Sequence, residues 1–599
     1  MYQYTEFDKQ FVRERAAQYR DQWERYSKGL LSEDEFRPLR LQNGWYVQRY
    51  APMLRVAVPY GELNSAQLRV LAKIAREYDL PNAELFDKAQ TTQDAIGGIQ
   101  APPLTKGYGH FTTRQNVQFN WIPLDKSADV MDLLASVNMH GIQTSGNCIR
   151  NITSDERAGV AVDEWVDPRP FAEILRQWST LHPEFAFLPR KFKIAITGAE
   201  EDRAATAWHD VGLRLMRNEK GEIGFRVLVG GGMGRTPITA TVIREFLPWH
   251  QILHFLEAVV RVYNRWGRRD NLYKARIKIL VKAEGPRFIQ EVSDEYQRIL
   301  TQDGAPHTLT EAELARVKAS FLPPQLPSKH PNAEAVHRLL TQAADQDKDF
   351  ARWLGQNVAP HRDPHLRVVT LSFKRLGQAP GDATADQLDA AAELADRFSA
   401  GEARVSHDQN LVLPWVAADQ LPALYQEAKA LGLAKPNIRL LTDMIACPGG
   451  DYCALANARS LPIAAAITAR YQDLDELFDL GEIDLHISGC INSCGHHHSG
   501  HIGILGVDKD GKEWYQVTLG GSDGSSLSGE PKPGKVVGPS FSSAEVVDVI
   551  EAILQVYTEQ REHAETFAEC LQRLGLEPFK LAANAARHPS DDEALTSAA

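Results

Sequence analysis

The pattern of apolar and polar positions opens with a charged helical stretch. Residues 7–26 are typical of a helix, and Ser32-Glu-Asp-Glu-Phe resembles the start of a second one. Residues 1–50 therefore predict a helical arm. No run approaches about 18 apolar residues, so no transmembrane helix and no membrane partner are expected. The first residues lack a basic segment followed by an apolar one, so no signal peptide is predicted and the expected location is the cytoplasm.

An internal repeat organises the rest of the chain. Each copy has a strand, a helix and a second strand, followed later by two further matching segments. The matched segments begin at Leu54 and Leu366, Ser65 and Ala385, Thr113 and His407, Lys193 and Asp484, and Val227 and Val517. Matches kept in this order indicate a duplication. A βαβ-type half followed by a strand-rich half, present twice, predicts a pseudo-twofold α+β molecule.

The repeat predicts the domain boundaries. They are an arm at 1–50, paired half-domains at 51–143 and 365–438, a first larger domain at 144–330, a connector at 331–364, a second larger domain at 439–585 and a tail at 586–599. The first copy has extra residues at 81–106, which we interpret as a surface loop between helix and strand.

Composition narrows the class of protein. The 599 residues are 43% hydrophobic and 24% charged, an ordinary globular balance. The net charge of −12 disfavours a nucleic-acid partner. Only six cysteines are present, too few for a disulfide framework, yet four of them lie between positions 447 and 494.

The four clustered cysteines predict a metal centre. They form Cys447-x5-Cys453 and Cys490-x3-Cys494, and glycines flank both pairs. Four thiolates commonly hold an iron–sulfur cluster, and glycine lets backbone N–H groups approach cluster sulfurs. A structural zinc site fits the second pair but not the first, whose spacing is too long. Scattered structural thiols are the remaining alternative.

The motifs Cys-Pro-Gly-Gly-x-x-Cys and Gly-Cys-x-Asn-x-Cys-Gly resemble those of the sirohaem and [4Fe–4S] sulfite/nitrite reductase family, and most of all its assimilatory sulfite reductase haemoproteins. The resemblance covers residues 40–560. It implies ferredoxin-like half-domains paired into one domain, beside two α/β domains that bind sirohaem and the cluster. It also implies that Cys447, Cys453, Cys490 and Cys494 hold the [4Fe–4S] cluster, and that Cys494 bridges to the sirohaem iron.

Basic residues are the expected partners of an anionic cofactor and substrate. Lys191 and Lys193 share a strand face, which alone indicates no more than a solvated strand edge. The resemblance implies that both lysines hold substrate and supply protons, and that Arg150 contacts substrate. Many family members have Arg-x-Arg in the first strand. Here Arg55 is present, but Ala57 occupies the position of the second arginine. Arg55 is therefore a candidate catalytic residue in an altered motif.

The resemblance also implies residues that contact sirohaem. They are Arg114, Gln115, Gln118, Asn147, Gln409 and Asn410. For Gln115 and Asn410, ordinary hydrogen bonding within a strand is the alternative. Gly230–Thr236 lacks dinucleotide-loop spacing and is interpreted as a backbone nest for an anion. Residues 268–278 form a basic helix start whose place near sirohaem is again implied by resemblance. His496, His497, His498 and His501 are possible cofactor contacts.

The expected function is assimilatory reduction of sulfite to sulfide, a six-electron reaction that feeds cysteine biosynthesis. The alternative is a nitrite reductase that makes ammonia, which is also a six-electron reduction. The resemblance favours sulfite over nitrite, because nitrite enzymes of the family tend to have Asn where this chain has Lys193. A noncatalytic haem and iron–sulfur carrier or sensor is a third possibility. No flavin or NADPH motif is present, so the electron donor is expected to be ferredoxin or a flavoprotein reductase subunit.

Overall fold

The computed structural model describes residues 1–95, 104–326 and 331–587. The two helices predicted at the N-terminus are confirmed as α1 (Glu6–Ser27) and α2 (Glu33–Gln42). A capping box starts each helix, at Thr5 and at Ser32, so the side chain and backbone of each N-cap residue are both satisfied. Helix α1 packs against α5 (Ser127–Ser136).

Two five-stranded sheets form the paired half-domains, and each borrows a strand from the other copy. The first has the order β1 (Trp45–Val47), β2 (Pro52–Val56), β5 (Val117–Phe119), β4 (Tyr108–Phe111), β13 (Asp382–Thr384). The second has the order β11 (Val358–Pro360), β12 (Leu366–Leu371), β15 (Leu411–Ala417), β14 (Glu402–Val405), β3 (Glu62–Asn64). The exchange of β3 and β13 ties the two copies together.

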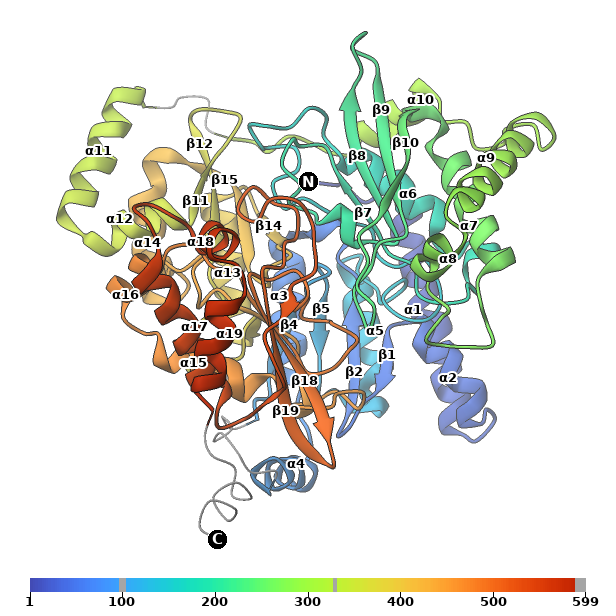
Figure 1. Ribbon diagram of the computed structural model, residues 1–599. Helices are drawn as coiled ribbons and strands as arrows, with labels where there is room; N and C mark the ends of the chain where they lie inside the picture. The colour runs from blue at the N-terminus through green and yellow to red at the C-terminus, as the bar shows by residue number, and fades with distance from the viewer. Residues whose placement is uncertain (96–103, 327–330, 588–599) are drawn as a thin grey trace.

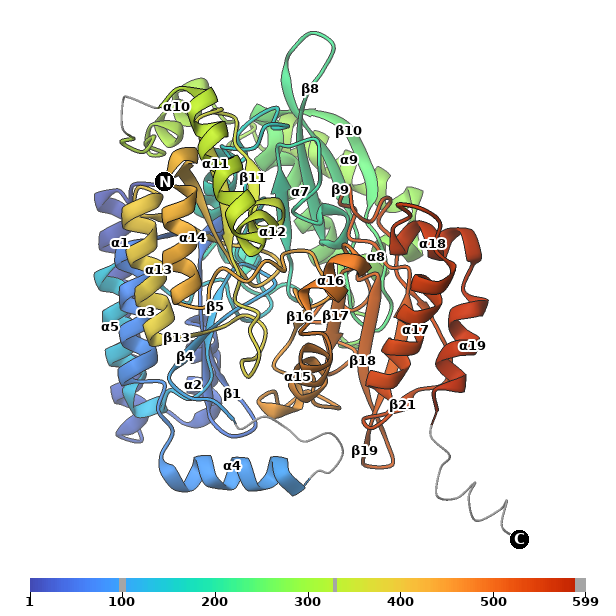
Figure 2. The same cartoon turned by 90° about the vertical axis from the view of Figure 1, so that its left-hand side faces the viewer.

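Helices of the two copies meet against these sheets. Helix α3 (Ser65–Glu77) packs on α13 (Ala385–Phe398), and α14 (Leu421–Ala430) joins the same layer (Figure 2). Asn64 caps α3 and Thr384 caps α13, each with a glutamine three residues later, so the repeat extends to the capping boxes. Leu68 and Leu388 are fully buried at equivalent places in the shared core.

The two larger domains each contain a sheet whose first two neighbouring pairs are parallel and whose next pair is antiparallel. The first contains β6 (Thr153–Ser154), β7 (Ile194–Thr197), β8 (Val211–Arg217), β9 (Ile223–Val229) and β10 (Thr241–Pro248). The second contains β16 (Ile445–Ala446), β17 (Leu485–Ser488), β18 (Ile502–Lys509), β19 (Lys512–Leu519), β20 (Lys535–Val536) and β21 (Phe541–Ser542).

Helices accompany both larger domains (Figure 1). The first has α6 (Arg169–Ser179), α7 (Ile252–Trp266), α8 (Ile277–Glu284), α9 (Pro286–Thr301) and α10 (Glu311–Ala319). The second has α15 (Leu461–Arg470), α16 (Leu474–Leu480), α17 (Val546–Gln560), α18 (Phe567–Leu574) and α19 (Glu577–Ala585). The expected duplicated α+β fold is confirmed. In the described ranges, no helix combines the length and apolar character needed to span a membrane.

The insertion in the first copy differs from its prediction. The surface-loop interpretation is wrong over α4 (Ala83–Ala95), and residues 96–103 lie outside the described residues. Ala89 and Leu104 are buried in the core of the second larger domain, and this apolar anchoring explains why the segment is ordered as a helix. The predicted connector contains α11 (Ala333–Gln346) and α12 (Lys348–Gln356), and most of the predicted tail, 588–599, lies outside the described residues.

Candidate active site

Strand pairing brings the cysteine segments together. Strands β16 and β17 are parallel neighbours, so their carboxyl ends meet at one sheet edge. Cys447 directly follows β16, and Cys490 lies two residues beyond the end of β17. The Cys447 N–H donates to the Ile487 carbonyl across this edge at 3.2 Å. The sheet itself therefore gathers cysteines that are far apart in sequence.

Glycine allows close backbone approach at the same edge. A Cβ on Gly489 would lie 2.5 Å from the Ala458 carbonyl oxygen and 2.7 Å from Gly449 Cα, so no side chain fits there. The Gly489 N–H donates to Cys447 Sγ at 3.2 Å. Such N–H to sulfur bonds are typical of cluster ligands, whose negative charge they stabilise.

The thiols form one electrostatic group. Burial and, after it, the negative charge of Cys494 raise the pKa of Cys447 to about 12. Burial likewise raises the pKa of Cys453 and Cys490, again with a contribution from Cys494. Buried thiols held protonated in this way need a cationic metal centre to become thiolates. The four free cysteines are the donor type that an iron–sulfur cluster uses.

Cations line the amino ends of the strands in the first larger domain. Lys193 directly precedes β7, and Arg150 lies three residues before β6, with its N–H bonded to the Phe192 carbonyl at 2.8 Å. Phe192 is fully buried in the core, so Lys191 and Lys193 share the opposite side of the chain, as alternation predicts. Among the described residues, neither lysine Nζ has a hydrogen-bond or carboxylate partner.

The unpaired lysines fit an anionic ligand. Burial lowers the pKa of Lys191 to about 8 and that of Lys193 well below its ordinary value. The Cys494 thiolate opposes both shifts, so both lysines lie within electrostatic reach of that cysteine. Both lysines are half-buried, and an ammonium group that loses water without gaining a partner is costly. An anionic tetrapyrrole and an anionic substrate would relieve that cost, so these residues fit both groups.

Direct contacts hold the cationic edge against the cysteine loop. The Thr113 hydroxyl donates to the Cys494 carbonyl at 2.9 Å, and His498 Nε2 donates to the Gly234 carbonyl at 2.9 Å. The cysteine loop thus contacts both the turn that contains Arg114 and the loop that follows β9. The predicted cysteines and cations come from opposite copies and meet at this seam.

Arg114 and Gln115 lie in a tight turn between β4 and β5, so the predicted strand over 113–116 is wrong. The Gln115 N–H donates to the Thr112 carbonyl at 2.9 Å, and Gln115 has a φ of 57°. The Arg114 guanidinium donates to the Asn151 carbonyl at 2.7 Å and the Thr153 hydroxyl at 2.9 Å. Burial lowers the pKa of Arg114 to about 9, and no carboxylate bridges it in the described residues.

The side chains of Gln115 and Gln409 make equivalent backbone contacts in the two copies. Gln115 Nε2 donates to the Ser154 and Val405 carbonyls at 2.9 and 3.1 Å, and Gln409 Nε2 donates to the Phe111 and Ala446 carbonyls at 3.1 and 3.0 Å. Each amide oxygen also accepts a backbone N–H, from Ser154 or Ala446. Both residues are buried, so their contacts favour a structural role, and their cofactor role stays a prediction.

The other predicted cofactor residues are placed as follows. Asn410 donates to Asp443 Oδ1 at 2.8 Å and accepts the Phe373 N–H at 2.9 Å, a structural pattern. Gln118 joins Asn120 and Arg55 at 2.9 Å each, near the cationic edge. Asn147 has an exposed side chain on the loop that contains Arg150.

Arg55 reaches the loop of Arg150. Both guanidinium groups donate to the Thr144 carbonyl, Arg55 at 3.3 Å and Arg150 at 2.7 Å. Arg55 therefore lies beside a predicted substrate residue, although Ala57 replaces the second arginine of the motif. Ala57 is buried, and its N–H bonds the His140 carbonyl at 2.8 Å.

Sequence reasoning missed an acidic anchor in this site. Asp210 is fully buried, receives the Lys193 N–H at 2.8 Å and pairs with Arg276 at 2.8 Å. Arg276 belongs to the basic segment at 268–278 and caps α8. Lys278 Nζ bonds the Met233 and Thr236 carbonyls of the predicted anion nest, so carbonyl groups of that loop face an ammonium.

The histidine cluster is largely internal. Burial lowers the pKa of His496 and His497 well below the ordinary value, and that of His501 to about 4. His501 hydrogen-bonds Ser528 at 3.0 Å, and His497 hydrogen-bonds Ser493 at 3.1 Å. His496 adjoins Lys193 and Arg114, and His498 adjoins Lys278, since these cations contribute to the lowered pKa of each histidine.

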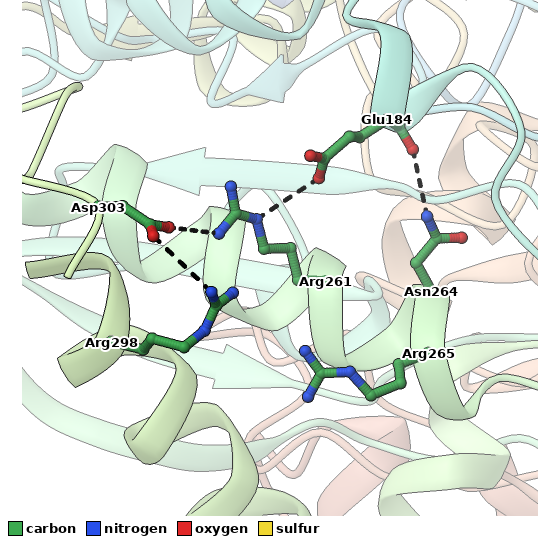
Figure 3. A pocket seen from close by; sticks show the side chains of 6 residues that line it. All are labelled: Glu184, Arg261, Asn264, Arg265, Arg298 and Asp303. Carbon is green, nitrogen blue, oxygen red and sulfur yellow. Dashed lines mark hydrogen bonds and ion pairs between the residues drawn. The ribbon is translucent and has the colours of Figure 1, made fainter.

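A separate pocket of about 580 Å³ lies between α7, α9 and the segment before Lys191. Carboxylates pair with its arginines, inside the pocket for Arg261 and Arg298 (Figure 3) and outside its lining for Arg265, which pairs with Glu295 at 3.0 Å. Arg261 pairs with Asp303 at 2.9 Å and Glu184 at 3.5 Å, and Arg298 pairs with Asp303 at 3.7 Å. The pocket has no unpaired cation like those at the seam.

A cysteine centre that faces unpaired cations defines an iron–sulfur protein with a site for anions. The sequence matches the family described as nitrite and sulphite reductase 4Fe-4S domain over residues 145–300 and 439–587, and the nitrite/sulfite reductase ferredoxin-like half domain over 47–85, 104–137 and 370–431. The chain belongs to this sulfite/nitrite reductase family of oxidoreductases. The expected cofactors, sirohaem and a [4Fe–4S] cluster, are those of the family, which excludes the zinc alternative.

Relatives with either substrate name are similar to the chain. An assimilatory ferredoxin-dependent nitrite reductase of Haloferax mediterranei is 26% identical, covering 87% of this chain and 82% of its own length. Sulfite reductase [ferredoxin] 1 of Mycolicibacterium paratuberculosis is 26% identical, covering 85% and 84%. The solved structure of the NirA protein of Mycobacterium tuberculosis shares the fold, with a TM-score of 0.69, 23% identity and 92% of each chain covered.

Proposed function

We propose that this protein is an assimilatory sulfite reductase that converts sulfite to sulfide with electrons from ferredoxin. The observation that supports sulfite is the pair Lys191 and Lys193, whose ammonium groups have no carboxylate partners among the described residues and whose segment bonds the Arg150 backbone at Phe192. Two ammonium groups and a guanidinium suit an anion that carries up to two charges. Nitrite carries one charge and needs fewer cations.

Each residue has a role in this proposal. Cys447, Cys453, Cys490 and Cys494 would hold the cluster, and Cys494 would also ligate the sirohaem iron. When bound, the two groups supply single-electron transfer and a metal site for the substrate sulfur. Arg150, Lys191 and Lys193 hold the substrate oxygens through hydrogen bonds and offset their negative charge. The two lysines also donate protons as S–O bonds break. Arg114 would hold cofactor carboxylates.

The alternatives predict different contacts. A carrier or sensor needs no cations for a substrate. In this protein the ammonium groups of Lys191 and Lys193 have no carboxylate partners among the described residues, which costs free energy. A nitrite reductase keeps the same fold and cofactors and remains the second candidate, because relatives with both names match the chain. Ferredoxin is proposed as donor because relatives of both kinds are named for it.

The test is anaerobic turnover of the cofactor-loaded protein with reduced viologen. We expect a higher kcat/KM for sulfite than for nitrite, with sulfide as the product. A higher kcat/KM for nitrite would contradict the substrate assignment and keep the family. Loaded protein that turns over neither anion would support the carrier.

A further inference from the structure

Strand register places Tyr46 beside the substrate cations. In β1, Trp45 is fully buried and Val47 is exposed, so the side chain of Tyr46 alternates to the other face. Tyr46 pairs with Met53 on β2, and Arg55 is two residues further along the same face. The Arg55 guanidinium lies over the Tyr46 ring, 5.4 Å from its centroid.

Three donors converge on one acceptor at this point. The Tyr46 hydroxyl, Arg55 Nη1 and Arg150 Nη1 all donate to the Thr144 carbonyl oxygen, at 3.2, 3.3 and 2.7 Å. A carbonyl oxygen has two lone pairs, so it cannot satisfy three donors well. Arg55 Nε is also buried without a partner in the described part of the chain. The group therefore has donor capacity left for an anion.

The charges around Tyr46 are almost all positive. Arg150, Arg55 and Lys191 lower the pKa of its phenol against the effect of burial, which is the largest single contribution and raises it. Two other residues of the loop that contains Thr144 lie nearby. Ser145 also lowers the pKa of the phenol, and the Cys148 thiol bonds the Ser145 carbonyl at 3.1 Å. No carboxylate is among the groups that shift the phenol. A phenolate formed here would be stabilised.

We propose that Tyr46 is a catalytic acid of this site, which turns from the Thr144 carbonyl to a substrate oxygen and protonates it. The proposal rests on the proposed reduction of an oxyanion. The Tyr46 hydroxyl is also a hydrogen-bond donor near the altered Arg-x-Arg motif, where the side chain of Ala57 has no donor.

The proton step balances as follows. The phenolic O–H bond breaks and a new O–H bond forms on a substrate oxygen. As the S–O bond breaks, a second proton, from Lys191 or Lys193, completes a water molecule, and two electrons from the donor protein reduce the sulfur. The phenolate stays beside Arg55 and Arg150 until solvent water returns its proton.

The test compares Tyr46→Phe with Tyr78→Phe, the same change at the end of α3 and away from the site. Phenylalanine keeps the ring over Arg55 and removes only the hydroxyl. We expect kcat for sulfite with reduced viologen to fall about 100-fold in Tyr46→Phe, with KM changed much less, because general acids contribute about that much. Tyr78→Phe should keep wild-type kinetics.

A second readout needs no bound cofactor. In ultraviolet difference titrations of the cofactor-free protein, one tyrosine should ionise below the ordinary range, and Tyr46→Phe should remove that transition. Wild-type kinetics in Tyr46→Phe, or a raised KM with unchanged kcat, would overturn the proton role. An unchanged ultraviolet titration would overturn the proposed environment. If the wild type turns over no sulfite, the proposed function fails, and the titration still decides the environment of Tyr46.

Discussion

At the scale of single residues, the site combines cations that the protein alone does not neutralise. Lys191 and Lys193 have lowered pKa values because burial disfavours their charged forms. Such groups destabilise a protein that lacks its anionic ligands and bind those ligands well. The two lysines therefore lower the stability of the cofactor-free protein, and the same unpaired charges favour binding of the anionic ligands.

This cost gives a pH-dependent prediction for the cofactor-free protein. The pKa of Lys191 is about 8 in the folded chain, below its ordinary value of about 10.4 when unfolded. Between these values the unfolded chain binds more protons, so stability rises with pH. Below about pH 8 the cost is fully present. We expect Lys191→Met to stabilise the cofactor-free protein by about 1 kcal/mol at pH 7 and by less at pH 10, measured by urea unfolding.

The matched control is Lys220→Met, which changes an exposed lysine at a turn between β8 and β9. Its effect on the free energy of unfolding should be small at both pH values. Lower stability of Lys191→Met at pH 7 would contradict the interpretation, because it would mean that Lys191 has a stabilising partner.

At the level of helices, strands and turns, the elements set by local sequence could be predicted, whereas those that depend on contacts with distant residues could not. The helix start at Ser32 follows from its capping sequence, and the duplication follows from ordered matches. The turn that contains Gln115 was mistaken for strand because its positive φ depends on distant partners, Ser154 and Val405. Gln409 likewise has a positive φ, and its partner Phe111 belongs to the other copy, so its conformation could not be predicted locally either.

The residues of the candidate site also fall into those with a local sequence signal and those without one. The four cysteines could be predicted because their spacing and flanking glycines are local features. Tyr46 could not, because its place depends on the pairing of β1 with β2 and on the loop at Thr144. Asp210 was missed for a similar reason, since its partners Lys193 and Arg276 are distant in sequence.

At the scale of the whole molecule, the duplication creates a seam with one cationic and one cysteine-bearing side. Electrons must enter near the cysteines. Leu455, two residues after Cys453, is 71% exposed, and Val47, at the end of β1, is 57% exposed. Gln48 and Arg49 join this hairpin to the cysteine loop through the Ala454 N–H and the Ala456 carbonyl. We expect a small acidic donor protein to dock here.

A charge and polarity change tests this docking surface. The double variant Arg49→Glu, Leu455→Glu should raise the KM for ferredoxin about tenfold, because it adds two negative charges to the contact and removes one positive charge. Turnover with reduced viologen should stay near the wild-type rate. Arg338→Glu on α11, at the other end of the molecule, is the control (Figure 1). An unchanged KM in the double variant would place the donor elsewhere.

In the proposed function, the paired lysines make sulfite the preferred anion. The most direct measurement is the ratio of kcat/KM for sulfite to that for nitrite, with reduced viologen, in the wild type and in Lys193→Asn. We predict that the variant keeps its cofactor spectrum and loses about tenfold or more of this ratio, because one charge that holds the dianion is gone. An unchanged ratio in a fully loaded variant would contradict the account.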